Sequence, residues 1–130
     1  MSFDGVHVPV ITPFDNDGNV DRARLAEFVD ILIDAGVDGL VAVGTTGEAY
    51  ALTIDERHTV ISTIVKQAAG RVPVLAGAGG YDTREVIHLV QRAEKAGANG
   101  ILSVTPYYNK PTPEGLYQHY KAVAESTALP

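Results

Sequence analysis

The sequence has no cysteine, no tryptophan and only one methionine. Without cysteine, the chain cannot form a disulfide, use a thiolate nucleophile or bind zinc through sulfur. Basic residues are also scarce: 10 Lys and Arg stand against 16 Asp and Glu, and the net charge is −6. Nucleic acids and anionic membranes attract basic surfaces, so this balance argues against both as partners.

Long apolar runs and targeting signals are missing as well. No run approaches the roughly 18 apolar residues of a membrane span. Residues 1–5 lack the basic and apolar regions that open a signal peptide, so we expect a cytoplasmic protein. No metal site is expected either, because no two of the histidines stand at the helical spacing of a ligand pair. These histidines are His7, His58, His88 and His119.

The sequence does contain a regular alternation of strand-like and helix-like segments. Apolar runs predict strands at residues 8–10, 39–43, 72–74 and 100–104. A stretch with helical period follows each run; the first is predicted over residues 21–35. The next two open with capping-box spacing, Thr53 to Glu56 and Asp82 to Glu85, and the fourth opens with Thr112-Pro113-Glu114. The apolar stripe expected on the fourth helix is Leu116, Tyr120, Val123 and Ala124.

This order indicates an α/β fold with a parallel sheet and right-handed crossovers. A (β/α)8 barrel needs about 250 residues, and the pair Leu129-Pro130 repeats the start of the strand patterns at residues 8–9 and 72–73. We therefore expect residues 1–130 to be the N-terminal (β/α)4 half of a TIM barrel, truncated at the start of strand five. Half a barrel has two free strand edges and would leave about 400 Å² of apolar surface exposed to water, which costs roughly 10 kcal/mol. We therefore expect a homo-oligomer, a partly ordered species or an aggregate.

In such barrels, function lies in the loops at the carboxyl ends of the strands. The loop after the second strand reads Gly44-Thr45-Thr46-Gly47-Glu48. Its hydroxyl and N–H groups suit a small carboxylate, although a turn whose threonines bond their own backbone fits the spacing equally well. The loop after the fourth strand carries adjacent phenols, which could transfer protons, but aromatic packing is the favoured interpretation from these residues alone. That loop reads Thr105-Pro106-Tyr107-Tyr108-Asn109. A third loop, residues 77–80, is glycine-rich but lacks the lysine of a phosphate-binding loop.

Together with Val10-Ile11-Thr12-Pro13, the two loop motifs resemble the dihydrodipicolinate synthase and N-acetylneuraminate lyase family along the whole chain. The Tyr107-Tyr108-Asn109 motif points to the synthase branch. The resemblance implies a class I lyase that joins a lysine to pyruvate as a Schiff base and needs no cofactor. It further implies aspartate semialdehyde as the aldehyde acceptor, in lysine biosynthesis.

The resemblance also implies roles for individual residues. Thr46 and its backbone N–H would hold the pyruvate carboxylate, while Thr45 and Tyr108 would belong to a hydroxyl relay. The residue matching Tyr108 reaches into the neighbouring subunit's site in this family. The supporting residues near the site or the tight-dimer interface would be Gly44, Gly47, Glu48, Tyr50 and Tyr107. Feedback inhibition by lysine is not expected, because Ile54 and Arg57 stand where some relatives have a histidine-containing cluster.

The Schiff-base lysine of the family would fall after Pro130. The chain's own lysines are poor substitutes, because three lie on predicted helices outside the barrel and one lies in a loop with no apolar pocket. These are Lys66, Lys95 and Lys121 on helices, and Lys110 in the loop. We therefore expect a synthase fragment that is inactive alone. The alternatives are a non-catalytic half-barrel oligomerisation module, or a fragment of a family member acting on a sugar-acid or hydroxyproline-derived keto acid.

Overall fold

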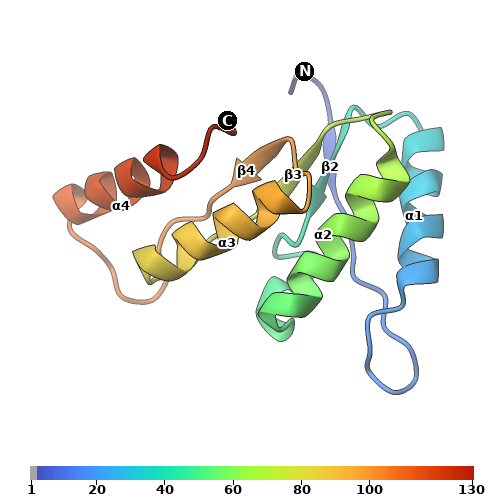
Figure 1. Ribbon diagram of the computed structural model, residues 1–130, viewed down its shortest axis with the longest axis horizontal. Helices are drawn as coiled ribbons and strands as arrows, with labels where there is room; N and C mark the ends of the chain where they lie inside the picture. Colours follow the sequence, from blue (N-terminus) through green and yellow to red (C-terminus); the bar gives the residue numbers. More distant parts are fainter. Residues whose placement is uncertain (1–2) are drawn as a thin grey trace.

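The computed structural model describes residues 3–130 as one parallel sheet flanked by helices (Figure 1). Residues 1–2, part of the chain start considered above, lie outside the described residues. In chain order the elements are β1 (His7–Pro9), α1 (Arg22–Asp34), β2 (Gly39–Ala42), the 3-10 helix η1 (Ala49–Ala51), α2 (Ile54–Ala68), β3 (Val74–Gly77), α3 (Thr83–Lys95), β4 (Gly100–Leu102) and α4 (Pro113–Glu125). The expected alternation of strands and helices is confirmed.

The four strands are parallel and lie in sequence order, β1-β2-β3-β4. In a (β/α)8 barrel each helix connects one strand to the parallel strand beside it, which gives this same order. The expected (β/α)4 half barrel is therefore confirmed. Beyond β4, the backbone N–H of Ile101 donates to the carbonyl oxygen of Pro130 at 2.8 Å. The segment after α4 therefore runs beside β4, where the proline pattern at Leu129-Pro130 predicted a strand start.

The hydrophobic core lies between the sheet and helices α1, α2 and α3, which cover one face of the sheet (Figure 1). Leu40 and Val74 are register partners in β2 and β3, and both are fully buried toward this side. Leu25 of α1 and Ile64 of α2 are also fully buried. Each such side chain contributes about 1.5–3 kcal/mol by leaving water, so this layer stabilises the described fold.

The opposite face of the sheet, which would line a barrel interior, is open. Leu102, at the end of β4, keeps 48% of its surface exposed, and Val104 just beyond it keeps 46%. Leu75 in β3 is half-buried although its register partner Val41 is buried. The loss of the opposing side-chain layer expected for half a barrel is therefore visible in the described residues.

Two details of the helices differ from the expectations. The Thr53–Glu56 capping box forms, but Asp82 caps α3 by accepting from the backbone N–H of Arg84 rather than through a box with Glu85. On α4 the buried residues are His119 and Val123, whereas Ala124 of the expected stripe is exposed.

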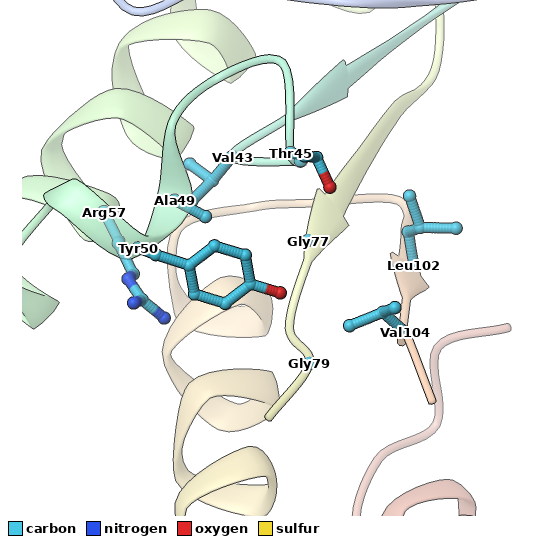
Figure 2. Close-up of a pocket in the computed structure, with 10 residues that line it drawn as sticks. Val43, Thr45, Ala49, Tyr50, Arg57, Gly77, Gly79, Leu102 and Val104 are labelled. Carbon is cyan, nitrogen blue, oxygen red and sulfur yellow. The ribbon is translucent and has the colours of Figure 1, made fainter. Parts of the chain in front are cut away.

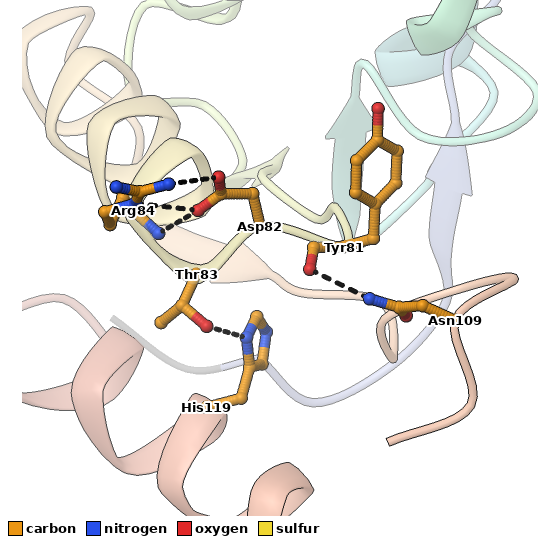
Figure 3. A network of polar contacts seen from close by, with 6 residues as sticks. All are labelled: Tyr81, Asp82, Thr83, Arg84, Asn109 and His119. Carbon is orange, nitrogen blue, oxygen red and sulfur yellow. Dashed lines mark hydrogen bonds and ion pairs between the residues drawn. The ribbon is translucent and has the colours of Figure 1, made fainter.

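His119 lies outside the expected apolar stripe, yet its side chain is buried on α4. Its Nδ1 is hydrogen-bonded to the hydroxyl of Thr83 in α3 at 2.9 Å (Figure 3). Across residues 3–130, none of the helices has the length and apolar character needed to cross a membrane.

Candidate functional site

The 44–48 loop follows β2 at the carboxyl edge of the sheet and is tied to the chain after β1. The buried hydroxyl of Thr12 donates to the carbonyl oxygen of Gly47 at 2.7 Å. Within the loop, the N–H of Glu48 donates to the carbonyl oxygen of Thr45 at 3.0 Å, and Glu48 has a left-handed φ of 55°. The side chains of Thr45 and Thr46 remain exposed. The loop is thus fixed through its backbone while both hydroxyls stay accessible.

A close backbone contact between Val43 and Gly77 holds the start of the 44–48 loop in position. Val43 is buried and has a φ of 55°, a left-handed conformation that β-branched residues rarely adopt. Its carbonyl oxygen lies against Gly77 of β3, where an added Cβ atom would stand only 2.1 Å from it. Strained backbone of this kind persists only where its surroundings hold it. Gly77 therefore leaves the space that the Val43–Gly44 peptide occupies.

A small pocket of about 50 Å³ opens at this point of the sheet edge. Figure 2 shows the Thr45 hydroxyl directed toward β3 at Gly77, and the Tyr50 ring reaching toward the same strand end. The lining residues come from the 44–48 loop, η1, α2 and the ends of β3 and β4. They are Val43, Gly44, Thr45, Ala49, Tyr50, Arg57, Gly77, Gly79, Leu102 and Val104.

Tyr107 lies beside this pocket within a cluster of tyrosines. Its ring packs edge-on against Tyr50, with centroids 5.0 Å apart, and against Tyr81, with centroids 5.5 Å apart. Burial of the ring and the neighbouring Tyr50 phenol raise the pKa of Tyr107 above its usual value. Tyr107 is therefore a protonated packing residue at neutral pH. The aromatic packing that the sequence favoured for this loop is confirmed for Tyr107.

The raised pKa of Tyr107 predicts its behaviour in alkaline solution. In a spectrophotometric titration of the six tyrosines, the Tyr107 phenol is expected to appear as a late component that ionises above the usual tyrosine value. Tyr107→Phe should remove that late component. Because the pKa of Tyr107 is higher in the folded than in the unfolded protein, its protonated phenol contributes to the free energy of unfolding. This contribution is complete below the unfolded pKa, which is near 10, and is lost as the pH rises through the folded pKa. A late component that survives Tyr107→Phe would contradict the assignment.

Tyr108 is not brought to the pocket of Thr45 within this chain. Its side chain is 99% exposed, and its backbone has a φ of 73°. It borders a separate surface hollow together with Tyr81, Tyr107 and Asn109. The proposed pair of hydroxyls, Thr45 and Tyr108, is therefore not assembled within the part of one chain that the structure describes.

Three contributors to this region were not identified from the sequence as site residues. Thr12 holds the 44–48 loop, and Tyr120 of α4 is hydrogen-bonded to the Thr105 hydroxyl at 3.1 Å. Asn109 donates through Nδ2 to the carbonyl oxygen of Tyr81 at 3.3 Å (Figure 3). Thr12 and Asn109 stood inside the quoted motifs, but no sequence signal indicated their partners.

None of the four lysines of the sequence lines the pocket around Thr45. Lys66, Lys95 and Lys121 lie on helices and are exposed, as expected from the helical pattern. Lys110 is exposed in the loop after β4, at a φ of 45°.

Comparison with known proteins gives consistent matches along the chain. The sequence model of the Dihydrodipicolinate synthetase family matches residues 2–130. The 4-hydroxy-tetrahydrodipicolinate synthase of Bacillus subtilis is 48% identical over 130 residues, which are 100% of this chain and 45% of that protein. The enzyme of the same name from Neisseria meningitidis serogroup B is 52% identical over 126 residues, 97% of this chain and 43% of that protein.

The fold has matching solved structures. The chloride-inhibited dihydrodipicolinate synthase from Acinetobacter baumannii, complexed with pyruvate, superposes with a TM-score of 0.96 at 49% identity. The match covers 99% of this chain and 44% of that one. The chain thus spans less than half the length of the relatives it matches.

Proposed function

This chain belongs to the dihydrodipicolinate synthetase family, and from that premise we propose that it is the N-terminal half of a 4-hydroxy-tetrahydrodipicolinate synthase. The complete enzyme would bind pyruvate to a lysine as a Schiff base and join it to aspartate semialdehyde. The observation that carries the proposal is the 44–48 loop, which Thr12 fixes so that the Thr45 hydroxyl faces a pocket at the carboxyl edge of the sheet. Active sites of TIM barrels lie at this edge.

Within the proposed reaction, the two loops supply one carboxylate-binding residue and two hydroxyls that transfer protons. Thr46, with its backbone N–H, binds the carboxylate of pyruvate, since N–H and hydroxyl donors are strong partners for an anion. Thr45 and Tyr108 transfer protons at the reacting carbon through their hydroxyls. The exposure of Tyr108 supports a site shared between two subunits, because its phenol projects from its own chain instead of entering the pocket of Thr45. The functional form is accordingly a homo-oligomer.

These 130 residues do not supply the amine for the Schiff base. A nucleophilic lysine needs a desolvated site that lowers its pKa, whereas the four lysines within residues 3–130 are exposed and none of them lines the pocket of Thr45. The amine must therefore come from a second half of the barrel. We use the term completed barrel for residues 1–130 joined in one polypeptide to the C-terminal half of a relative.

The proposal predicts where pyruvate becomes attached. Residues 1–130 alone, incubated with pyruvate and borohydride, are expected to gain no adduct in a mass spectrum. The completed barrel should gain one reduced pyruvate adduct per subunit, on a lysine of the added half, and should turn over aspartate semialdehyde. An adduct on any lysine of residues 1–130 would contradict the assignment.

The same assay separates the alternatives. A completed barrel that forms the pyruvate adduct but prefers a sugar-acid or hydroxyproline-derived substrate would place the chain in another branch of the family. A completed barrel that assembles without binding pyruvate would favour the oligomerisation module, which the exposed Leu102 and Val104 on the open sheet face also fit.

A further inference from the structure

The loop after β4 holds Tyr108 in a conformation that its own residue type disfavours. Tyr108 has a φ of 73°, in the left-handed region where the Cβ atom of an L-residue crowds the following carbonyl. Its side chain is 99% exposed, so burial of the ring does not stabilise this conformation. The contacts that hold the backbone must therefore come from the neighbours of Tyr108.

Both neighbours are attached to the rest of the chain. The backbone N–H of Asn109 donates to the carbonyl oxygen of Tyr107 at 3.0 Å, which closes a three-residue turn centred on Tyr108. The Asn109 side chain donates to the carbonyl oxygen of Tyr81, just before α3, at 3.3 Å (Figure 3). On the other side of the turn, the Tyr107 ring packs edge-on against the rings of Tyr81 and Tyr50.

Tyr81 thus contacts both ends of the turn, one through its backbone carbonyl and the other through its ring. We propose that Asn109 and Tyr81 are positioning residues that set the Tyr108 phenol in its projecting geometry within one subunit, before a second subunit is bound. The proposal rests on the proposed function, in which that phenol transfers a proton in the neighbouring site. A preset hydroxyl saves the entropy of ordering the loop during the reaction, and a displacement of about 1 Å can cost roughly 100-fold in rate.

The test uses Asn109→Ala in the completed barrel, with Asn16→Ala as the matched control in an exposed turn. Asn109→Ala is expected to lower kcat by about 10- to 100-fold while the KM for pyruvate stays within about twofold, because Thr46 is untouched. In a Tyr108→Phe background the same substitution should cause no further loss. Amide hydrogen exchange at residue 109, measured by NMR, should become at least about 10-fold faster as the turn opens, with exchange at Val123 in α4 unchanged.

Tyr81→Ala provides a second variant, which removes the ring and keeps the backbone carbonyl. It should also lower kcat only when the Tyr108 hydroxyl is present. Equal losses with and without that hydroxyl, or unchanged exchange at residue 109 in Asn109→Ala, would overturn the proposal. If Tyr108→Phe alone leaves turnover unchanged, the relay in the proposed function is wrong, and the exchange rate at residue 109 then decides whether the turn is held as proposed.

Discussion

Replacing Gly77 with alanine in the completed barrel is expected to reduce turnover by about 100-fold and to destabilise the fold by about 1–3 kcal/mol. The added Cβ atom would stand 2.1 Å from the carbonyl oxygen of Val43 and 2.8 Å from its carbonyl carbon. Both atoms are backbone, so the Val43–Gly44 peptide must move by roughly 1 Å or more to restore van der Waals contact. Thr45 and Thr46 follow directly in the chain and would move with it.

Steady-state kinetics and thermal unfolding of the same sample check this result. The KM for pyruvate should rise together with the fall in kcat, because the displacement reaches both Thr46, the proposed carboxylate-binding residue, and Thr45, the proposed relay residue. Gly115→Ala is the matched control: its Cβ atom would meet a side-chain oxygen, that of Thr112, at 3.2 Å, in the first turn of α4. Unchanged kinetics in a folded Gly77→Ala protein would show that the loop does not depend on this contact.

The order of the elements was predictable because it depends on local patterns. Apolar runs, helical periodicity and capping residues lie within a few positions of one another, and the handedness of parallel crossovers then leaves few topologies. The Thr53–Glu56 box and the Thr112–Pro113 start of α4 were recognised for this reason. The place of the 44–48 loop at the carboxyl edge followed from the strand before it.

The contacts that shape the candidate site could not be predicted in the same way, because they join distant residues. Thr12 bonds a carbonyl 35 positions later, and the sequence does not specify which backbone group a buried hydroxyl will meet. The glycines of residues 77–80 were considered as a phosphate loop. The structure gives a packing reason for two of them: Gly77 adjoins Val43, and a Cβ atom on Gly79 would lie 2.3 Å from Cγ1 of Val104.

The left-handed backbone conformations of Val43 and Tyr108 could not be predicted from the sequence either, because neither residue type favours them. These conformations follow from long-range packing rather than from intrinsic preference. They occur at the start of the 44–48 loop and in the turn that presents Tyr108, which are the two segments with proposed catalytic hydroxyls. Departures from local rules are expected to concentrate at functional sites, and their position here supports the same two loops.

Tyr108→Phe in the completed barrel is expected to lower kcat by about 10²- to 10⁴-fold, the usual contribution of a positioned proton donor. The change removes one oxygen from a side chain that is 99% exposed, so it should leave the unfolding midpoint and the KM for pyruvate nearly unchanged. Steady-state kinetics should show the loss in kcat, and Tyr117→Phe, on the exposed side of α4, should show none. A Tyr108→Phe enzyme with near wild-type kcat would remove this phenol from the relay.

Mixing two inactive variants tests whether Tyr108 acts in its own subunit or in its neighbour. Thr45→Val disables the pocket of its own chain, while Tyr108→Phe, in the proposed arrangement, disables the pocket of the partner. When the two proteins are dissociated and reassembled together, half of the randomly formed dimers contain one site with both hydroxyls intact. About a quarter of wild-type activity should then return. If Tyr108 served its own subunit, every site in the mixture would lack one hydroxyl and no activity would return. The recovered activity therefore measures whether the exposed phenol completes the site of another chain.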